Sequence, residues 1–187
     1  MKNLFLRFSA TFTLTVSPAS QLVGLQGGSV NYSVTITGGN GFTNSVSLSV
    51  SGLSAGATAG FTPPSVSGSG GSTLSVTASN GTPQGVYTLT IMGVGGGYTN
   101  MATATLAVLA PLFTGVALAG TNLVFSGIGG YPGSNYGYYV LAGTNLAVPP
   151  VNWTVVATGA FDQNGSFVFT NGWEPNSGQQ FYLLQLQ

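Results

Sequence analysis

Apolar and polar residues alternate with a period of two along much of this chain. Six runs in the first 110 residues show it clearly: 11–16, 30–37, 46–50, 73–77, 87–91 and 102–108. A period of two, rich in Val, Ile and Thr, predicts half-buried β-strands. Turn signals such as Gly38-Gly39-Asn40-Gly41 separate the runs, and no stretch has a helical period. The pattern predicts an all-β, antiparallel sandwich.

The pattern changes near residues 109–111, after which aromatic residues become denser. We therefore predict two tandem antiparallel β-sandwich domains, over 11–110 and 111–187. Residues 1–10 form a separate segment. Its apolar stretch is interrupted by Arg7, whereas a secretory signal needs about 7–15 uninterrupted apolar residues. We interpret residues 1–10 as a docking or donor segment.

The first domain resembles the immunoglobulin-like repeats of large secreted bacterial proteins. The resemblance is carried by residues 12–20, 27–35, 41–58, 61–66 and 85–91. It implies a seven-strand sandwich that serves as a spacer or adhesion module. Tyr87 stands where a tyrosine corner would lie, with its hydroxyl bonded to backbone across the turn. Leu89 and Leu48 are the expected core substitutes for the Cys pair and Trp of antibody domains.

The second domain resembles a C-terminal module that ends large exported proteins of the Verrucomicrobia and Planctomycetes. The resemblance is carried by residues 123–127, 138–146, 153–156, 161–162, 165–170 and 180–185. It implies position and export rather than an activity.

Charge is nearly absent. Lys2, Arg7, Asp162 and Glu174 are the only charged residues, and His and Cys do not occur. The charged fraction is 2%, against about 25% in an ordinary soluble domain. We therefore expect no thiol chemistry, no His/Cys metal site, no His-assisted nucleophile and no cofactor. With no basic patch we expect no nucleic-acid partner, and with no apolar run near ~18 residues, no membrane span.

The two carboxylates are the only candidates for acid–base catalysis. Asp162 and Glu174 could hydrolyse a glycoside if they lay about 5–10 Å apart across a cleft. Both lie in turn settings, so we predict no catalytic residues. Asp162-Gln163-Asn164-Gly165 resembles the start of a calcium loop, but Trp173 stands where the bidentate Glu belongs. We interpret residues 161–167 as a hairpin with Asn-Gly in its turn.

Other features of the second domain concern its aromatic residues and a repeat. Leu-Ala-Gly-Thr-Asn-Leu occurs at 118–123 and at 141–146, which predicts two similar strand–turn–strand corners in one sheet. Core positions are expected for Trp153, Phe167, Phe169 and Phe181. The loop 129–138 is the candidate glycan contact, through Tyr131, Tyr136 and Tyr138.

The lack of charge also bears on function, because sheet edges are normally protected by charged side chains. Open, uncharged edges favour pairing with another chain. We predict a non-enzymatic extracellular or cell-surface structural protein that assembles with copies of itself by strand addition. Leu4, Phe5, Leu6 and Phe8 are the predicted assembly residues. The alternative is a spacer or adhesion module, in a larger secreted protein, that binds polysaccharide.

Overall fold

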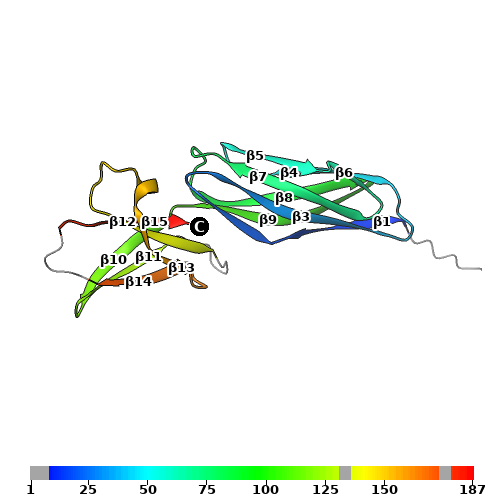
Figure 1. The fold of residues 1–187 in the computed structure, drawn as a ribbon. Helices are drawn as coiled ribbons and strands as arrows, with labels where there is room; N and C mark the ends of the chain where they lie inside the picture. The colour runs from blue at the N-terminus through cyan, green and yellow to red at the C-terminus, as the bar shows by residue number, and fades with distance from the viewer. Residues whose placement is uncertain (1–8, 131–135, 173–177) are drawn as a thin grey trace, which may run out of the picture. The chain divides into compact units, whose positions relative to one another are not determined.

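The computed structural model describes residues 9–130, 136–172 and 178–187 of the chain. It divides the chain into two compact units, Met1–Val108 and Leu109–Gln187. Both are built from antiparallel strands (Figure 1). In the described ranges no helix has the length and apolar character needed to cross a membrane.

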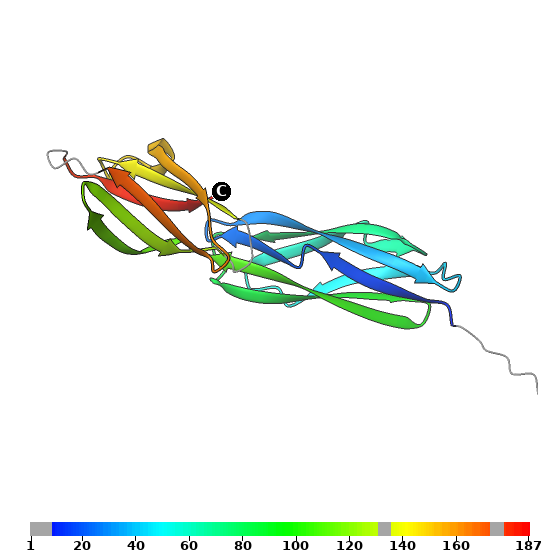
Figure 2. The same cartoon turned by 90° about the horizontal axis from the view of Figure 1, so that it is seen from below.

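The first unit is a sandwich of two sheets. The four-stranded sheet has the order β1 (Thr11–Ser17), β3 (Gly28–Gly39), β7 (Gly70–Ala78), β5 (Ala57–Thr62). The five-stranded sheet has the order β2 (Ser20–Gly24), β9 (Tyr98–Leu109), β8 (Gly85–Gly95), β4 (Ser45–Ser51), β6 (Ser65–Ser67). Figure 2 shows them as two layers, with β1 and β3 in blue in one and β9 in green in the other.

This strand order is that of an immunoglobulin-like fold. The order β1-β3-β7-β5 corresponds to strands A, B, E and D, and β9-β8-β4 to strands G, F and C. The predicted fold class is confirmed. The described residues of this unit form nine strands rather than the seven expected. Pro18, which has no N–H to donate to a ladder, separates β1 from β2, and the two strands lie in different sheets. The short β6 adds a strand beside β4.

Alternation along the strands builds the core of the first unit. The fully buried side chains include Tyr32, Val34, Leu74, Leu89 and Leu106, which come from both sheets. The Tyr32 hydroxyl on β3 donates a hydrogen bond of 2.7 Å to the backbone carbonyl of Thr105 on β9. This bond joins the two sheets by linking the strands that correspond to B and G.

The tyrosine corner predicted at Tyr87 is confirmed. The Tyr87 hydroxyl donates a hydrogen bond of 2.8 Å to the carbonyl of Pro83, four residues upstream and just before β8. Leu89, two residues later, is fully buried, as expected for the position of the missing cysteine. Leu48 is half-buried against the core, while Val46 on the same strand is fully buried.

The second unit is a smaller sandwich. One sheet has the order β10 (Leu112–Ala119), β11 (Asn122–Ile128), β14 (Ser166–Gly172); the other has β13 (Thr154–Ala160), β12 (Gly137–Gly143), β15 (Phe181–Leu186). A 3-10 turn, η1 (Pro150–Asn152), precedes β13. Aromatic rings from both sheets fill the core; the buried members are Phe125, Tyr138, Phe161, Phe167 and Phe169, with Val140 and Leu184.

The predicted hairpin at 161–167 is wrong in its strand pairing. The turn is tight, since the Asp162 N–H donates to the Ser166 carbonyl at 2.8 Å and Gly165 has a φ of 76°. However, β13 and β14 lie in different sheets, so the turn carries the chain across the sandwich. The crossing is stabilised by the core, where the rings of Phe161 and Phe167 meet edge to face at 5.9 Å.

The two copies of Leu-Ala-Gly-Thr-Asn-Leu also differ from the prediction, because they lie in different sheets. At 118–123 the sequence forms a tight β10–β11 turn in which Gly120 has a φ of 63°. At 141–146 it ends β12, and Gly143 is part of the strand. An added Cβ at Gly143 would lie 2.7 Å from ring atoms of Trp153. The second copy therefore differs in conformation from the first because its glycine packs against Trp153.

Candidate functional site

Several of the residues singled out from the sequence lie outside the described ranges. These are Leu4, Phe5, Leu6, Phe8, Tyr131 and Glu174. The candidates that the structure does place are Asp162, Tyr136 and Tyr138.

Asp162 has a structural role in its turn. One carboxylate oxygen accepts hydrogen bonds from the backbone N–H groups of Asn164, at 2.8 Å, and Ser166, at 2.9 Å. The side chain thus stabilises the turn between β13 and β14. In the part of the chain that the structure describes, no three residues of the types His, Cys, Asp or Glu gather to hold a metal ion.

Tyr138 is not an exposed platform for a sugar. Its side chain is 6% exposed, and its ring packs between Phe161 and Phe167 at centroid distances of 5.1 and 4.8 Å. Burial raises the pKa of the Tyr138 phenol above its ordinary value of 10.0. The expected glycan contact through Tyr138 is therefore wrong, because this ring is part of the core of the second unit. Tyr136 is half-buried and its carbonyl accepts a hydrogen bond from the Phe161 N–H at 3.0 Å.

The strands themselves carry no charge. Asp162 is the one charged residue within the described ranges, and it lies in a turn. No described strand, central or at an edge, therefore has a charged side chain. Edge strands of natural sheets usually carry such side chains, which discourage pairing with other chains. Here the described edges lack that protection.

Among the described edge strands, β10 carries the most exposed large apolar side chains. It pairs with β11 and lies at the end of its sheet. Three large apolar side chains on it are exposed, Leu112 at 45%, Val116 at 62% and Leu118 at 57%. We call these three residues on β10 the β10 edge.

Two residues of the β10 edge face the interior side of the sandwich. Val116 pairs with Phe125, and Leu118 pairs with Leu123. Directly paired residues lie on the same face of a sheet, and Phe125 belongs to the aromatic core. Val116 and Leu118 therefore point to the core side yet stay more than half exposed. The second sheet does not cover this end of β10.

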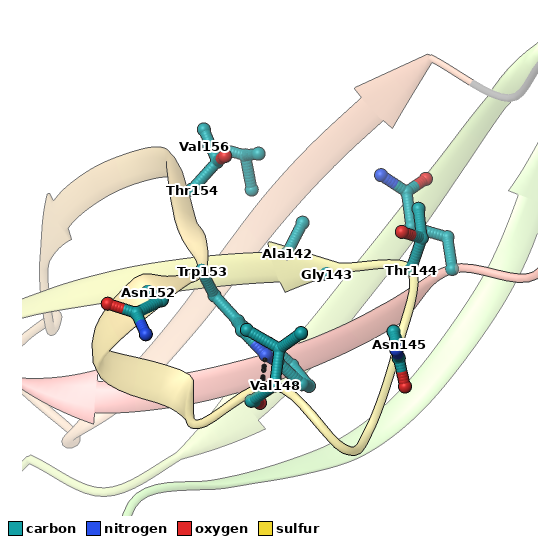
Figure 3. Close-up of a pocket in the computed structure, with 10 residues that line it drawn as sticks. Ala142, Gly143, Thr144, Asn145, Val148, Asn152, Trp153, Thr154 and Val156 are labelled. Carbon is teal, nitrogen blue, oxygen red and sulfur yellow. Dashed lines mark hydrogen bonds between the residues drawn. The ribbon is translucent and has the colours of Figure 1, made fainter.

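A groove on the second unit is the other candidate site (Figure 3). It has a volume of about 410 Å³, and Trp153 is among its lining residues, so we name it the Trp153 groove. Its lining comes from the end of β12, the loop to β13, the start of β13 and one residue before β15. The lining residues are Ala142, Gly143, Thr144, Asn145, Val148, Asn152, Trp153, Thr154, Val156 and Gln180.

Backbone and side-chain hydrogen bonds shape the loop that carries Trp153. The Trp153 indole Nε1–H donates to the carbonyl of Val148 at 2.8 Å (Figure 3). The Asn145 side-chain oxygen accepts the Ala147 N–H at 2.9 Å, forming an Asx-turn. Asn152 and Trp153 donate their backbone N–H groups to Pro149 and Pro150, which closes the η1 turn. The indole is therefore held in place by its own loop.

The core position expected for Trp153 is wrong, because its side chain is half-buried and does not belong to the buried aromatic cluster. Phe167 and Phe169 do occupy the core as expected, while Phe181 is half-buried. Sequence reasoning missed the groove because Gln180 and the loop meet only through the pairing of β12 with β15. The one local signal was a Trp flanked by Asn152 and Thr154.

No protein-family model and no curated protein sequence matches this chain. Solved structures of immunoglobulin-like and PapD-like β-sandwich domains are similar to it. They include the E. coli chaperone DraB (14% identity, TM-score 0.38, 92% of this chain and 96% of that one), and the D0-D1 domain of intimin (16%, 0.37, 95% and 91%). The I-band fragment I67-I69 of titin is also similar (11%, 0.40, 96% and 65%). At these scores the likeness carries no argument on function, and the fold class rests on the strand order above.

Proposed function

We propose that this chain is a non-enzymatic structural protein of the extracellular space or cell surface, which assembles with copies of itself through its sheet edges. The observation that carries the proposal is the β10 edge, with Val116 62% and Leu118 57% exposed on the core side of the strand that ends its described sheet. An uncharged, apolar edge strand is a template for another strand.

A strand from a second copy would supply both backbone pairing and apolar coverage to this edge. Its backbone would pair with the N–H and C=O groups on the unpaired side of β10, and its side chains would cover Val116 and Leu118. Full burial of one such side chain is worth about 1.5–3 kcal/mol, so covering two that are more than half exposed contributes roughly 2 kcal/mol or more. The backbone pairing adds a term that salt and pH do not change, because the strand carries no ionisable group.

The donor strand that we propose is the N-terminal segment of another copy. Residues 1–10 contain Leu4, Phe5, Leu6 and Phe8, which would supply the apolar side chains. In strand addition, backbone bonds supply affinity and alternate side chains supply specificity. This proposal assigns 1–10 to docking and the two sandwiches to the body of the subunit.

An extracellular setting is supported by the absence of Cys and by the resemblance of residues 10–110 to repeats of secreted bacterial proteins. The non-enzymatic character is supported by Asp162, whose carboxylate is engaged in its turn.

The experiment is electron microscopy of the purified full chain and of the double variant Val116→Lys, Leu118→Lys. We expect polymers from the wild type and none from the double variant, because two charges on an edge strand oppose strand addition. Val86→Lys is the matched control, since Val86 is 55% exposed on β8, which lies inside its sheet. Polymers that persist in the double variant would refute the role of β10.

Deletion of residues 1–10 tests the donor separately. We expect the truncated chain to stay folded and to lose its polymers. Unchanged filaments would rule out the donor role of Leu4, Phe5, Leu6 and Phe8.

The alternative, a spacer or adhesion module that binds polysaccharide, can no longer rest on Tyr138. A specific observation nevertheless favours a sugar-binding capacity, and it lies elsewhere, in the Trp153 groove.

A further inference from the structure

We infer that the Trp153 groove binds a neutral saccharide unit of a glycan chain. The inference goes beyond self-assembly and does not depend on it, because no residue of the β10 edge lines the groove. Its basis is an indole held by a hydrogen bond in the lining of a groove whose other lining groups are hydroxyls, amides and small apolar side chains.

The indole is positioned to contact a ligand rather than to fill the core. Its Nε1–H is satisfied by the Val148 carbonyl at 2.8 Å, and its ring packs against Gly143. A side chain larger than hydrogen at position 143 would come within 2.7 Å of the ring. The ring is thus fixed in orientation, while the side chain remains partly exposed to solvent. A Trp held in this way presents a flat apolar surface at low entropic cost.

The polar groups around the indole match hydroxyl groups. An amide donates through its NH₂ and accepts through its oxygen, and a hydroxyl also does both. Thr144, Asn145, Asn152, Thr154 and Gln180 supply such groups, and all five are exposed. Figure 3 shows the side chains of Asn152 and Asn145 on either side of Trp153 in that view. A saccharide presents an apolar C–H face and a rim of hydroxyls, which is the combination that this lining can meet.

Charge excludes the main competing ligand classes. None of the lining residues is ionisable at neutral pH, so an anion such as a phosphate or a sulfated sugar finds no cation. A metal ion finds no carboxylate, thiolate or imidazole there. A purely apolar ligand would leave the amides and hydroxyls of the rim without partners, which is costly for groups that become buried.

The volume of the groove and the exposure of its lining residues indicate that it binds one saccharide unit within a longer glycan. About 410 Å³ lies in the usual range for a small-molecule site, roughly 300–1,000 Å³. The polar lining residues are exposed, so the site does not enclose its ligand. A glycan could enter and leave along the surface, and we expect an individual site to bind weakly.

Some lining groups are already engaged and others are not. The Asn145 oxygen is used in the Asx-turn, and the Gln180 oxygen accepts a hydrogen bond from the Tyr182 hydroxyl at 2.8 Å. Within the described residues the Asn152 side-chain amide has no hydrogen-bond partner, although its backbone N–H is bonded to Pro149. Asn152 is therefore the residue through which sugar binding can be tested without disturbing the loop.

The test is a screen of arrayed neutral oligosaccharides of glucose, galactose, mannose and N-acetylglucosamine, with sulfated and sialylated oligosaccharides alongside. The protein is the full chain carrying Val116→Lys and Leu118→Lys, so that self-assembly does not interfere. Hits are titrated by isothermal titration calorimetry, which also measures variants that lack Trp153. The Trp153 emission is followed in a Trp173→Phe background, in which Trp153 is the single tryptophan.

We expect at least one neutral oligosaccharide to bind and to change the Trp153 emission. Trp153→Ala should weaken binding at least about tenfold, as for a tryptophan at the centre of a contact. Asn152→Ala should weaken it about two- to tenfold through one lost hydrogen bond. Asn164→Ala is the matched control, because Asn164 is also exposed and does not line the groove; it should leave binding unchanged.

The inference is overturned if no neutral oligosaccharide binds, if only anionic ones bind, or if Asn152→Ala binds as the wild type does. Should Trp153→Ala fail to fold, the Asn152 and Asn164 variants decide the question. Failure of the self-assembly proposal is seen separately, in the electron micrographs of the wild type.

Discussion

Two tyrosine hydroxyl groups make long-range or corner hydrogen bonds in the first sandwich, whose described residues include no charged residue and no cysteine. The Tyr87 hydroxyl closes the corner before β8 by bonding to Pro83 at 2.8 Å, and Tyr32 joins β3 to β9 through Thr105. These hydrogen bonds fix the corner before β8 and the position of β3 relative to β9, which apolar packing alone would specify less uniquely.

We predict that Tyr87→Phe lowers the free energy of unfolding by about 1 kcal/mol, which is the net value of one such hydrogen bond. Tyr98→Phe is the control, because the described structure shows no hydrogen bond of the Tyr98 hydroxyl, and it should be neutral. Urea denaturation of both variants measures the difference. Equal stabilities would show that the corner contributes nothing.

A second residue-scale prediction concerns Tyr138 and pH. Burial raises the pKa of its phenol above 10.0, so above that pH the unfolded chain releases this proton more readily than the folded chain. The contribution of the Tyr138 phenol to the free energy of unfolding is therefore fully present below pH 10.0 and is lost as the pH rises further. Urea midpoints measured from neutral to strongly alkaline pH should fall less in Tyr138→Phe than in the wild type. Parallel decreases would contradict the burial of this hydroxyl.

At the scale of elements, one hexapeptide adopts two structures. Gly120 takes a left-handed conformation, with a φ of 63° and no atom within 4 Å of an added Cβ, whereas Gly143 lies in β12 beneath the Trp153 ring. Context, rather than the local sequence, decides between a tight turn and the end of a strand.

This difference predicts different effects of the same substitution. Gly120→Ala should cost about 1 kcal/mol through its backbone conformation alone and leave the Trp153 emission unchanged. Gly143→Ala should cost about 1–3 kcal/mol through overpacking and shift that emission, because the ring must move. Thermal unfolding and fluorescence in the Trp173→Phe background separate the two. A wild-type spectrum for Gly143→Ala would contradict the position of the indole.

The individual strands could largely be predicted, because a period of two is a local signal. The runs 11–16, 30–37 and 87–91 all lie within observed strands. The strands β2, β5 and β6 were not among the predicted runs. Strands of five and three residues, as in β2 and β6, are too short to show a period, and β5 consists mainly of small residues. The crossing at 161–167 was mistaken for a hairpin because its course is decided by long-range packing of Phe161 on Phe167. The Trp153 groove was missed for the same reason, since Gln180 joins it only through sheet pairing.

At the scale of the whole molecule, the proposed self-assembly should be independent of salt, because charge is nearly absent. Between roughly 0.01 M and 1 M salt the Debye length falls from about 30 Å to 3 Å, which weakens any contact between exposed charges. Strand pairing and apolar burial do not depend on that length. We predict that polymers formed in low NaCl persist in high NaCl, as measured by sedimentation. Dissolution on raising NaCl would show that Lys2, Arg7, Asp162 or Glu174 hold the subunits together.

Self-association is most directly tested by multi-angle light scattering of the full chain over a range of concentrations. The mass of one chain is 18.8 kDa. The account predicts an apparent mass that rises with concentration through multiples of this value, and a constant 18.8 kDa for the Val116→Lys, Leu118→Lys variant. A wild-type chain that stays at the mass of a monomer at its highest soluble concentration would contradict it.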